Sequence, residues 1–571
     1  MTVGVVVAVQ DGGPSVFGDE QIYADNARAI AELRAYASAH YPPVYPIVLA
    51  AGLVLSGGSY LGMLLAGSVA SALAVPAMWW LARSLELRHR WLPVALVALA
   101  PFQSVMAGYL LSENASPTVA LLAVTLAVRG RRREAPWFGV SLAALHLTKY
   151  LFAPMVLVLL VTWWLRSGTD VRPPRRVRAL LIALGSYLTP MALWVVYGLA
   201  SGHRLPALFG LQIISSTAPR GAQEGTAAAL GTWVTVYPAY LLLACLLACA
   251  VIVIEAAHRS PRRAPWRLAL ARLSSGRVAF AATIGTLVVG YVAVAVQHSL
   301  GAPYNHPVPD HPVPRYLVHL VPLVLALGAL ALEAVTMRGG ARGPRLWLPT
   351  VGVLVAAWAA WGILYRGWVW GLPSWSLNRA FNAVDTFVLR DPARMALLSV
   401  AVVALAWLLR RPRVVVAALP WLVASAVVLA TATVTVVSQS PAPGSRQQAI
   451  AHYLSDVRRA GHDQIELWVA PHSLSAATIQ QSAVFWHPEH RGLLGSTAVD
   501  RDRAESLSSC GVEALDPASP QEIVHLLVTD AAPDGVAPVL VTGSGDGRVV
   551  VVALDPSCVA AALLDTPVTE S

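Results

Sequence analysis

Long apolar runs, separated by short polar loops, constrain the fold of this chain more than any other feature. A helix needs about 20 apolar residues to cross a bilayer. Only 13% of the 571 residues are charged, against about 25% in soluble domains. The sequence therefore predicts an all-α polytopic membrane protein with about 12 transmembrane helices. The runs lie at roughly 60–86, 91–110, 114–129, 135–148, 150–166, 177–200, 233–256, 278–298, 316–337, 345–365, 393–410 and 414–438.

The arginines predict how these helices are oriented. Loops that face the cytoplasm carry an excess of Lys and Arg. Arginine-rich loops alternate along the chain with loops that are acidic, aromatic or rich in histidine, so we place the first set in the cytoplasm and the second outside. The net charge of +10 is then a topology signal rather than a nucleic-acid footprint. The arginine-rich loops are 83–90, 129–133, 166–178, 259–277, 338–345 and 410–413.

Lys149 lies between two runs, 135–148 and 150–166, that are shorter than a full span. We expect two half-buried helices that meet at a break there. Lys149 is the only lysine among 41 basic residues. A contact with phosphate and snorkelling to lipid headgroups are both open explanations for it. The bias toward arginine, alanine, valine and glycine indicates a GC-rich, bacterial genome.

Residues 1–59 are predicted to form an N-terminal stub and the first external loop. The stub, residues 1–10, is apolar but too short to span, so we expect a first span before the loop. The loop carries Gly18-Asp19-Glu20-Gln21-Ile22-Tyr23 and His40-Tyr41-Pro42-Pro43-Val44-Tyr45-Pro46. Carboxylates beside a bilayer are costly to desolvate, so we expect the Asp19-Glu20 pair to lie in a wet cavity and to have a function.

Residues 60–438 form the predicted transmembrane module, and the composition changes at 439–571. The apolar spans stop there, and strand-like runs appear at 464–469, 523–529, 537–542 and 547–554, with helix-like segments at 445–460 and 474–485. We predict a soluble α/β domain on the outer face. Cys510 and Cys558 both lie in it. Because paired cysteines outside the cytoplasm tend to oxidise, a disulfide between them is a hypothesis.

Many polar residues are predicted to lie on the outer side, at or near the membrane surface. Carboxylates, cations and histidines around one aqueous cavity indicate a reaction on a charged substrate rather than a simple pore. The prolines of 306–319 and the absence of paired helical spacing argue against a metal site there. The residues are Asp19, Glu20, Tyr23, Asp25, His40, Tyr41, Glu113, His146, Lys149, Tyr150, Tyr304, His306, Asp310, His311, Arg315, Tyr316 and His319.

The order of several short motifs resembles that of the GT-C glycosyltransferases. The pattern is most similar to the protein-mannosyltransferase and aminoarabinose-transferase type, glycosyltransferase family 39 and its relatives, and it covers about residues 15–335. The matching motifs are Gly18-Asp19-Glu20 with Tyr23, Tyr41-Pro42-Pro43 with Tyr45-Pro46, Ser112-Glu113, Leu147-Thr148-Lys149, and Arg315-Tyr316-Leu317 with Pro322.

The resemblance implies an inverting transfer of a sugar from a polyprenyl-phosphate donor, without a metal or a cofactor. The acceptor is a cell-envelope glycan, a glycolipid or a protein on the outer face of the plasma membrane. It implies that Asp19 is the catalytic base, with Glu20 as its neighbour, and that Lys149 and Arg315 bind the donor phosphate. The further cavity candidates are Tyr23, His40, Tyr41, Glu113, His146 and Tyr316.

This chain differs from the motif pattern of each branch of the family. The aminoarabinose transferases have arginine two positions after the Asp-Glu and lysine before the Pro-Pro, where this chain has Ile22 and Tyr41. The protein mannosyltransferases have histidine directly before the Pro-Pro, and here His40 stands one residue earlier. A secondary transporter, a flippase for lipid-linked substrates and a non-catalytic scaffold for the C-terminal domain remain alternative functions. The sugar, the acceptor and the oligomeric state stay open.

Overall fold

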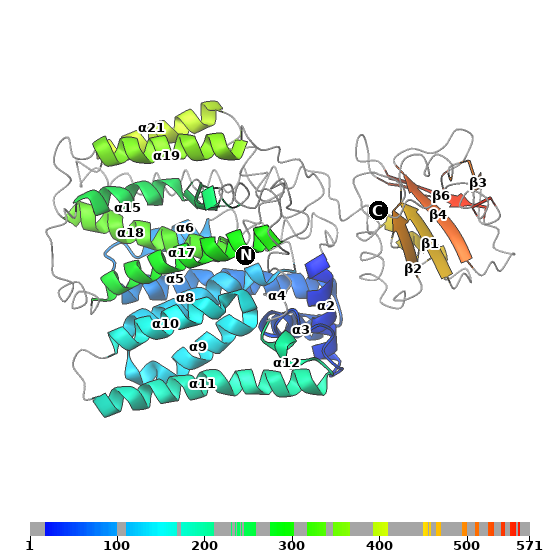
Figure 1. Cartoon of the computed structure of the whole chain (residues 1–571), viewed down its shortest axis with the longest axis horizontal. Helices are drawn as coiled ribbons and strands as arrows, with labels where there is room; N and C mark the ends of the chain where they lie inside the picture. The colour runs from blue at the N-terminus through cyan, green and yellow to red at the C-terminus, as the bar shows by residue number, and fades with distance from the viewer. Residues whose placement is uncertain are drawn as a thin grey trace. The chain divides into compact units, whose positions relative to one another are not determined.

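The computed structural model describes residues 18–99, 110–167, 173–210, 275–301, 317–337, 347–365 and 392–408, with shorter stretches inside 230–258 and 449–559. The chain forms two compact units. One is built mainly from Asp25–Gly371 and Arg379–Val437, and the other from Ser438–Ser571 together with Val6–Ala24 and Leu372–Asn378. The first unit is helical and the second contains a β-sheet (Figure 1).

The helices of the described chain are mostly apolar. Their bounds are α2 (Gly18–Ala31), α3 (Val44–Leu55), α4 (Tyr60–Ala72), α5 (Ala74–Ser84), α6 (Trp91–Ala98), α8 (Ser116–Arg129), α9 (Ala135–Thr148), α10 (Ala153–Arg166), α11 (Pro173–Ala200), α12 (Leu205–Leu208), α15 (Leu246–His258), α17 (Gly276–Gly301), α18 (Val321–Met337), α19 (Trp347–Tyr365) and α21 (Pro392–Leu408). Short 3₁₀ turns are η1 (Ser112–Asn114), η2 (Arg132–Glu134), η3 (Tyr150–Phe152) and η6 (Val318–Leu320).

Three stretches of helix in the described residues are long and apolar enough to cross a membrane: Tyr60–Ser84, Pro173–Ala200 and Gly276–Gln297. Several shorter apolar helices coincide with the other predicted runs, among them α8, α10 and α18. The apolar helices fit the predicted membrane protein. The predicted run at 414–438 lies outside the described residues.

Proline and glycine mark the ends of the central helices. Pro117, Pro136 and Pro154 lie in the first turns of α8, α9 and α10, where a missing N–H removes no intrahelical hydrogen bond. Gly130 ends α8 with φ of 58°, a left-handed conformation that glycine adopts without strain. The predicted break at Lys149 is confirmed, because this residue is extended between α9 and η3.

Helix α3 was not expected from the sequence. Its 12 residues make a helix of about 18 Å, which is shorter than the roughly 30 Å hydrocarbon core. The run therefore escapes a search for spans. It packs against α4 and leaves Ile47, Val54 and Leu55 exposed. The first loop thus contains a short apolar helix directly after the Pro42-Pro43 motif.

The helical unit can be followed from neighbour to neighbour (Figure 1). Helix α11 packs on α9, α9 on α8, and α8 on both α5 and α10. Helix α10 contacts α17, and α18 contacts α17 and α15. Helices α19 and α21 follow on the far side of α15. The break at Lys149 therefore lies between α9, which contacts α8 and α11, and α10, which contacts α8 and α17.

The C-terminal unit contains a six-stranded sheet with strand order β2-β1-β4-β6-β3, and β5 pairs with β6. Strand β1 is parallel to both β2 and β4, whereas β6 is antiparallel to β4, β3 and β5. Strands β1, β4, β5 and β6 fall on predicted runs, while β2 and β3 were not predicted. The bounds are β1 (Gln464–Val469), β2 (Leu494–Ala498), β3 (Gly511–Val512), β4 (Ile523–Thr529), β5 (Leu540–Thr542) and β6 (Val549–Leu554).

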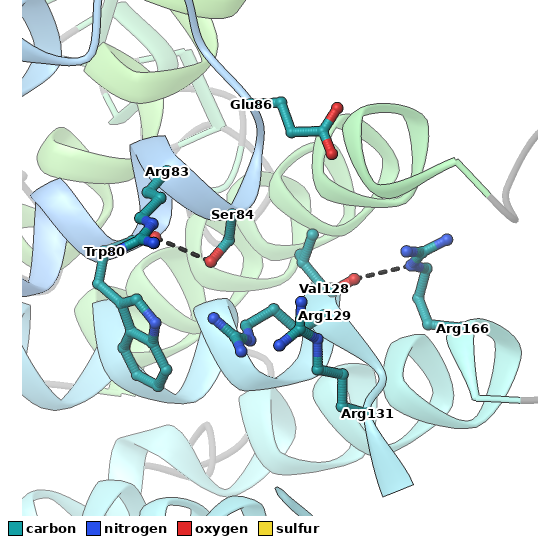
Figure 2. Close-up of a pocket in the computed structure, with 8 residues that line it drawn as sticks. All are labelled: Trp80, Arg83, Ser84, Glu86, Val128, Arg129, Arg131 and Arg166. Atoms are coloured by element: carbon teal, nitrogen blue, oxygen red, sulfur yellow. Dashed lines mark hydrogen bonds between the residues drawn. The ribbon is translucent and has the colours of Figure 1, made fainter.

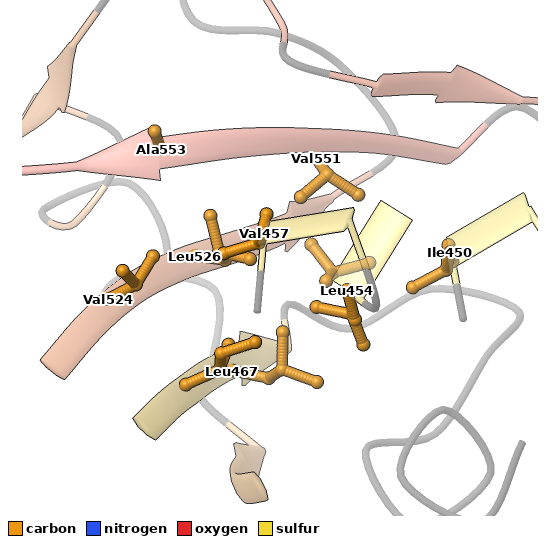
Figure 3. Close-up of a cluster of buried hydrophobic side chains, with 10 residues drawn as sticks. Ile450, Leu454, Val457, Leu467, Val524, Leu526, Val551 and Ala553 are labelled. Carbon is orange, nitrogen blue, oxygen red and sulfur yellow. The ribbon is translucent and has the colours of Figure 1, made fainter. Parts of the chain in front are cut away.

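Both faces of this sheet are covered. Alternate side chains of β1, β4 and β6 point to opposite faces, and each face carries its own buried cluster. On one face Ile450, Leu454 and Val457 pack on Leu526 and Val551 (Figure 3). The helical residues among these belong to the predicted segment 445–460. The predicted helix at 474–485 lies outside the described residues.

Candidate active site

The carboxylates singled out in the sequence open helix α2. Asp19 and Glu20 lie in its first turn, where the helix dipole stabilises negative side chains. Glu20 is completely buried and Tyr23, one turn later, is 2% exposed. Asp19 is only partly buried. Of the two carboxylates, Asp19 is therefore the more accessible to a substrate.

The loop after α2 is held by hydrogen bonds of its own. Asn26 donates to the carbonyl of Ser38 at 3.0 Å and accepts from the Ser38 amide at 2.8 Å. The Tyr36 hydroxyl donates to the carbonyl of Tyr41 at 2.8 Å, and burial raises the pKa of Tyr36 well above its usual value, so the hydroxyl stays protonated as a donor. His40 is exposed and its ring lies 5.0 Å from that of half-buried Tyr41.

The same loop is fastened to the end of α11. The Tyr36 amide donates to Ser201 Oγ at 3.0 Å, and His203 Nε2 lies 2.7 Å from the Tyr36 carbonyl oxygen. The Tyr197 hydroxyl donates to the Arg34 carbonyl at 3.0 Å. Segments more than 160 residues apart in the chain are thus joined. This stiffens the loop that carries His40 and Tyr41.

The central contact of the site is an ion pair between Lys149 and Glu113. Lys149 Nζ lies 2.7 Å from Glu113 Oε1. Glu113 sits in the 3₁₀ turn before α8, and Lys149 sits at the break after α9. The glutamate side chain is 4% exposed and the lysine side chain 18%. Two residues predicted separately, as a cavity candidate and as a phosphate ligand, are therefore direct partners.

Two neighbours of this pair were missed by the sequence analysis. Asn114 Nδ2 donates to the Tyr45 hydroxyl at 3.2 Å, and both side chains are buried. Gly67 makes room for them, since a Cβ there would lie 2.9 Å from the Tyr45 hydroxyl. Asn114 directly follows Glu113, and Tyr45 belongs to the quoted Pro42-Pro43 motif, so the motifs could have pointed to both side chains.

Two buried histidines lie at the same end of the bundle. His146 Nδ1 is 2.7 Å from the Tyr187 hydroxyl, and none of the described residues bonds its Nε2. His319 lies close enough to Lys149 for their charges to interact. Its ring is in edge contact with Phe152 at 4.7 Å and Tyr291 at 4.3 Å. Within the described part of the chain its Nε2 has no partner either.

The remaining predictions concern the segment 304–316, a metal site and a disulfide. Tyr304, His306, Asp310, His311, Arg315 and Tyr316 lie outside the described residues. Among the residues that are described, no group of three or more His, Cys, Asp or Glu is arranged to hold a metal ion. In the C-terminal unit, Cys510 and Cys558 form a disulfide with an S–S distance of 2.04 Å and a Cα–Cα distance of 5.5 Å.

Comparison with known proteins gives a match in structure but not in sequence. No protein-family model and no curated protein matches the chain. ArnT from Cupriavidus metallidurans in the apo state matches with a TM-score of 0.52 and 16% identity, over 98% of this chain and 96% of that one. ArnT bound to undecaprenyl phosphate matches with a TM-score of 0.54 and 17% identity, over 98% and 97% of the two chains.

The chain has the GT-C fold of ArnT. This confirms the fold that was predicted from the motifs. ArnT is an aminoarabinose transferase, and the second of these structures holds undecaprenyl phosphate.

Proposed function

We propose that this chain is a membrane glycosyltransferase that takes a sugar from a polyprenyl-phosphate donor and needs no metal or cofactor. The observation that carries the proposal is the ArnT fold over 98% of the chain, in a comparison that includes ArnT bound to undecaprenyl phosphate. The buried Glu113–Lys149 pair adds chemistry suited to a lipid phosphate.

The proposed reaction exchanges one bond at the anomeric carbon for another. An acceptor hydroxyl oxygen attacks that carbon while the bond from the carbon to the phosphate oxygen breaks, so the configuration inverts. Asp19 takes the hydroxyl proton; its partial exposure at the start of α2 supports this role over buried Glu20. The polyprenyl phosphate leaves with the bonding electron pair.

Lys149 is proposed to stabilise the charge that develops on this phosphate. Glu113 fixes the ammonium group at 2.7 Å, and a cation that is already in place loses little entropy when the phosphate arrives. Glu113 is therefore proposed as a positioning residue for Lys149. Arg315 is proposed as a second phosphate ligand, since arginine binds phosphate with two parallel hydrogen bonds.

We place the reaction on the outer face of the plasma membrane. The alternation of arginine-rich loops supports this side. The Cys510–Cys558 disulfide supports it independently, because disulfides persist in oxidising compartments and are rare in the cytoplasm. Cell-envelope glycans, glycolipids and proteins are the acceptor classes that this side offers.

The test uses membranes that contain the full chain and radiolabelled undecaprenyl-phosphate mannose or arabinose. Asp19→Asn should lower sugar transfer by about 10²–10⁴-fold, the usual contribution of a general base. Lys149→Ala should lower it as well. Asp25→Asn is the matched control, because Asp25 lies on the same helix and pairs with Arg28 at 3.4 Å; we expect it to retain activity.

Two results would count against the proposal. Wild-type transfer by folded Asp19→Asn would remove Asp19 as the base while leaving the enzyme class intact. A wild-type protein that consumes no polyprenyl-phosphate sugar at all would overturn the function itself.

A further inference from the structure

A second polar site lies away from the Glu113–Lys149 pair. It is a cavity of about 460 Å³, lined by Trp80, Arg83, Ser84, Glu86, Val128, Arg129, Arg131 and Arg166 (Figure 2). These residues come from the C-terminal ends of α5, α8 and α10 and from the turns that follow. We call it the arginine pocket.

The arginine pocket and the Glu113–Lys149 pair lie near opposite ends of helix α18. His319, an electrostatic neighbour of Lys149, lies just before the first residue of α18, and Glu333 lies in the last turns of this helix. Arg277 bonds Glu333 at 3.0 Å and the Leu85 carbonyl at 2.9 Å, so the end of α5 lies at the Glu333 end. The 17 residues of α18 extend about 25 Å.

The arginine pocket carries more positive charge than its own carboxylates neutralise. Four arginines and Glu86 line it, and Glu134 adds a second carboxylate by binding Arg129 at 3.0 and 2.6 Å. The balance of four cations against two carboxylates is +2. Among the described residues, no carboxylate lies within ion-pair distance of Arg83 or Arg166.

Several contacts build the arginine pocket before any ligand arrives. The Arg129 guanidinium lies 5.2 Å from the centre of the Trp80 ring. Arg166 Nε donates to the Val128 carbonyl at 2.7 Å, a bond that leaves its charge in place. Gly130, in the left-handed conformation, packs so closely on Arg166 that any Cβ at residue 130 would overlap it. Arg129 and Arg166 are therefore held in fixed positions.

Exposed tryptophans place the arginine pocket at the level of lipid headgroups. Trp79 on α5 is 46% exposed, Trp91 at the start of α6 is 40% exposed, and Trp137 in the first turn of α9 is 70% exposed. Tryptophan is enriched at the membrane–water interface. Basic pockets between membrane helices bind anionic lipid headgroups, and arginine matches the geometry of phosphate.

We propose that the arginine pocket binds the phosphate group of an anionic phospholipid. In the sequence these arginines indicate only the topology, whereas in the structure four of them line one cavity. Free phosphate offers the same chemistry as the headgroup, so the experiment has one arm for each source.

The experiment titrates delipidated full-length protein in detergent with phosphatidylglycerol or phosphatidylcholine and counts bound lipids by native mass spectrometry. We expect phosphatidylglycerol to bind in preference. The double variant Arg83→Gln, Arg131→Gln should bind it about 30-fold more weakly, because each arginine near the surface contributes about fivefold. Both side chains are exposed enough to be changed without disturbing the core.

The matched control is the double variant Arg132→Gln, Arg133→Gln. These arginines are exposed, directly follow Arg131 in the chain and do not line the cavity. The affinity for phosphatidylglycerol should therefore change by less than about twofold. In the second arm, millimolar inorganic phosphate is added to the wild type. Displacement of phosphatidylglycerol assigns recognition to the phosphate alone, and no displacement assigns it to the whole headgroup. Equal binding of the two lipids, or equal losses in both double variants, would overturn the proposal.

Discussion

The Glu113–Lys149 pair gives the sharpest test of the structure, because its two partners are buried to different degrees. Glu113 is 4% exposed and Lys149 is 18% exposed. Lys149→Met leaves a carboxylate with almost no contact to water, whereas Glu113→Gln leaves an ammonium group that retains some. We therefore expect Lys149→Met to be the more destabilising change, and the double variant to recover much of the loss.

The magnitude follows from the distance. At 2.7 Å and an effective dielectric constant of about 20, the gross Coulomb attraction is about 6 kcal/mol. Desolvation of the two ions offsets much of this in the intact pair. Removing one partner of a buried pair costs about 3–5 kcal/mol. Lys149→Met should lie in this range, Glu113→Gln below it, and the double variant nearer to wild type.

The assay is thermal unfolding of the purified protein in detergent, followed by fluorescence. For a helical unit of this size, a loss of about 3–5 kcal/mol lowers the midpoint by roughly 3–5 °C. The control is the pair Arg34–Glu32, whose side chains are 64% and 53% exposed. Exposed pairs contribute about 0–1 kcal/mol, so Arg34→Met should shift the midpoint by at most about one degree.

One pattern would refute the assignment of this pair. If Lys149→Met, Glu113→Gln and Arg34→Met all unfold at the wild-type midpoint, the ion pair is not buried as the structure describes. Equal losses for the two single variants, with no recovery in the double variant, would show that each side chain acts through other contacts.

Two further predictions concern turns and covalent links. The Cys510–Cys558 disulfide closes a loop with a sequence separation of 48 residues. The double variant Cys510→Ser, Cys558→Ser should therefore lower the free energy of unfolding of the C-terminal unit by about 4 kcal/mol and make this unit sensitive to protease. Alkylation of both thiols in the untreated wild type would contradict the disulfide. Gly130→Val should destabilise by more than about 1–2 kcal/mol, since its φ is 58° and the side chain would displace Arg166. Gly185→Ala, which meets no neighbouring atom within 4 Å, is the control, and equal midpoints for the two glycine variants would argue against the left-handed turn.

Much of the helical unit could be predicted because its signals are local. An apolar run has to become a helix in a bilayer, where an unpaired backbone group is too costly. The break at Lys149 was visible as two short runs around one cation, and α8, α10 and α18 follow predicted runs. Helix α3 was missed because its 12 residues are fewer than a span requires.

The candidate site was predictable in its residue types but not in its contacts. The motifs placed Glu113 and Lys149 on one side of the membrane, and their direct pairing depends on how α8 packs against α9. Asn114 and Tyr45 form a hydrogen bond across 69 residues of sequence, and His146 contacts the Tyr187 hydroxyl on α11. A local sequence pattern gives no signal for contacts between residues so far apart in the chain.

The sequence by itself determined the class of protein, the alternation of arginine-rich loops and the break at the lone lysine, because hydropathy and charge act on each segment separately. Only the tertiary structure decided which charges meet. Packing brings Glu113 to Lys149 at one end of α18 and leaves Glu333 with Arg277 at the other. It also gathers Arg83, Arg131 and Arg166 around one cavity. The physical reason is that electrostatic energy depends on distance and burial, which the chain acquires only when its helices pack.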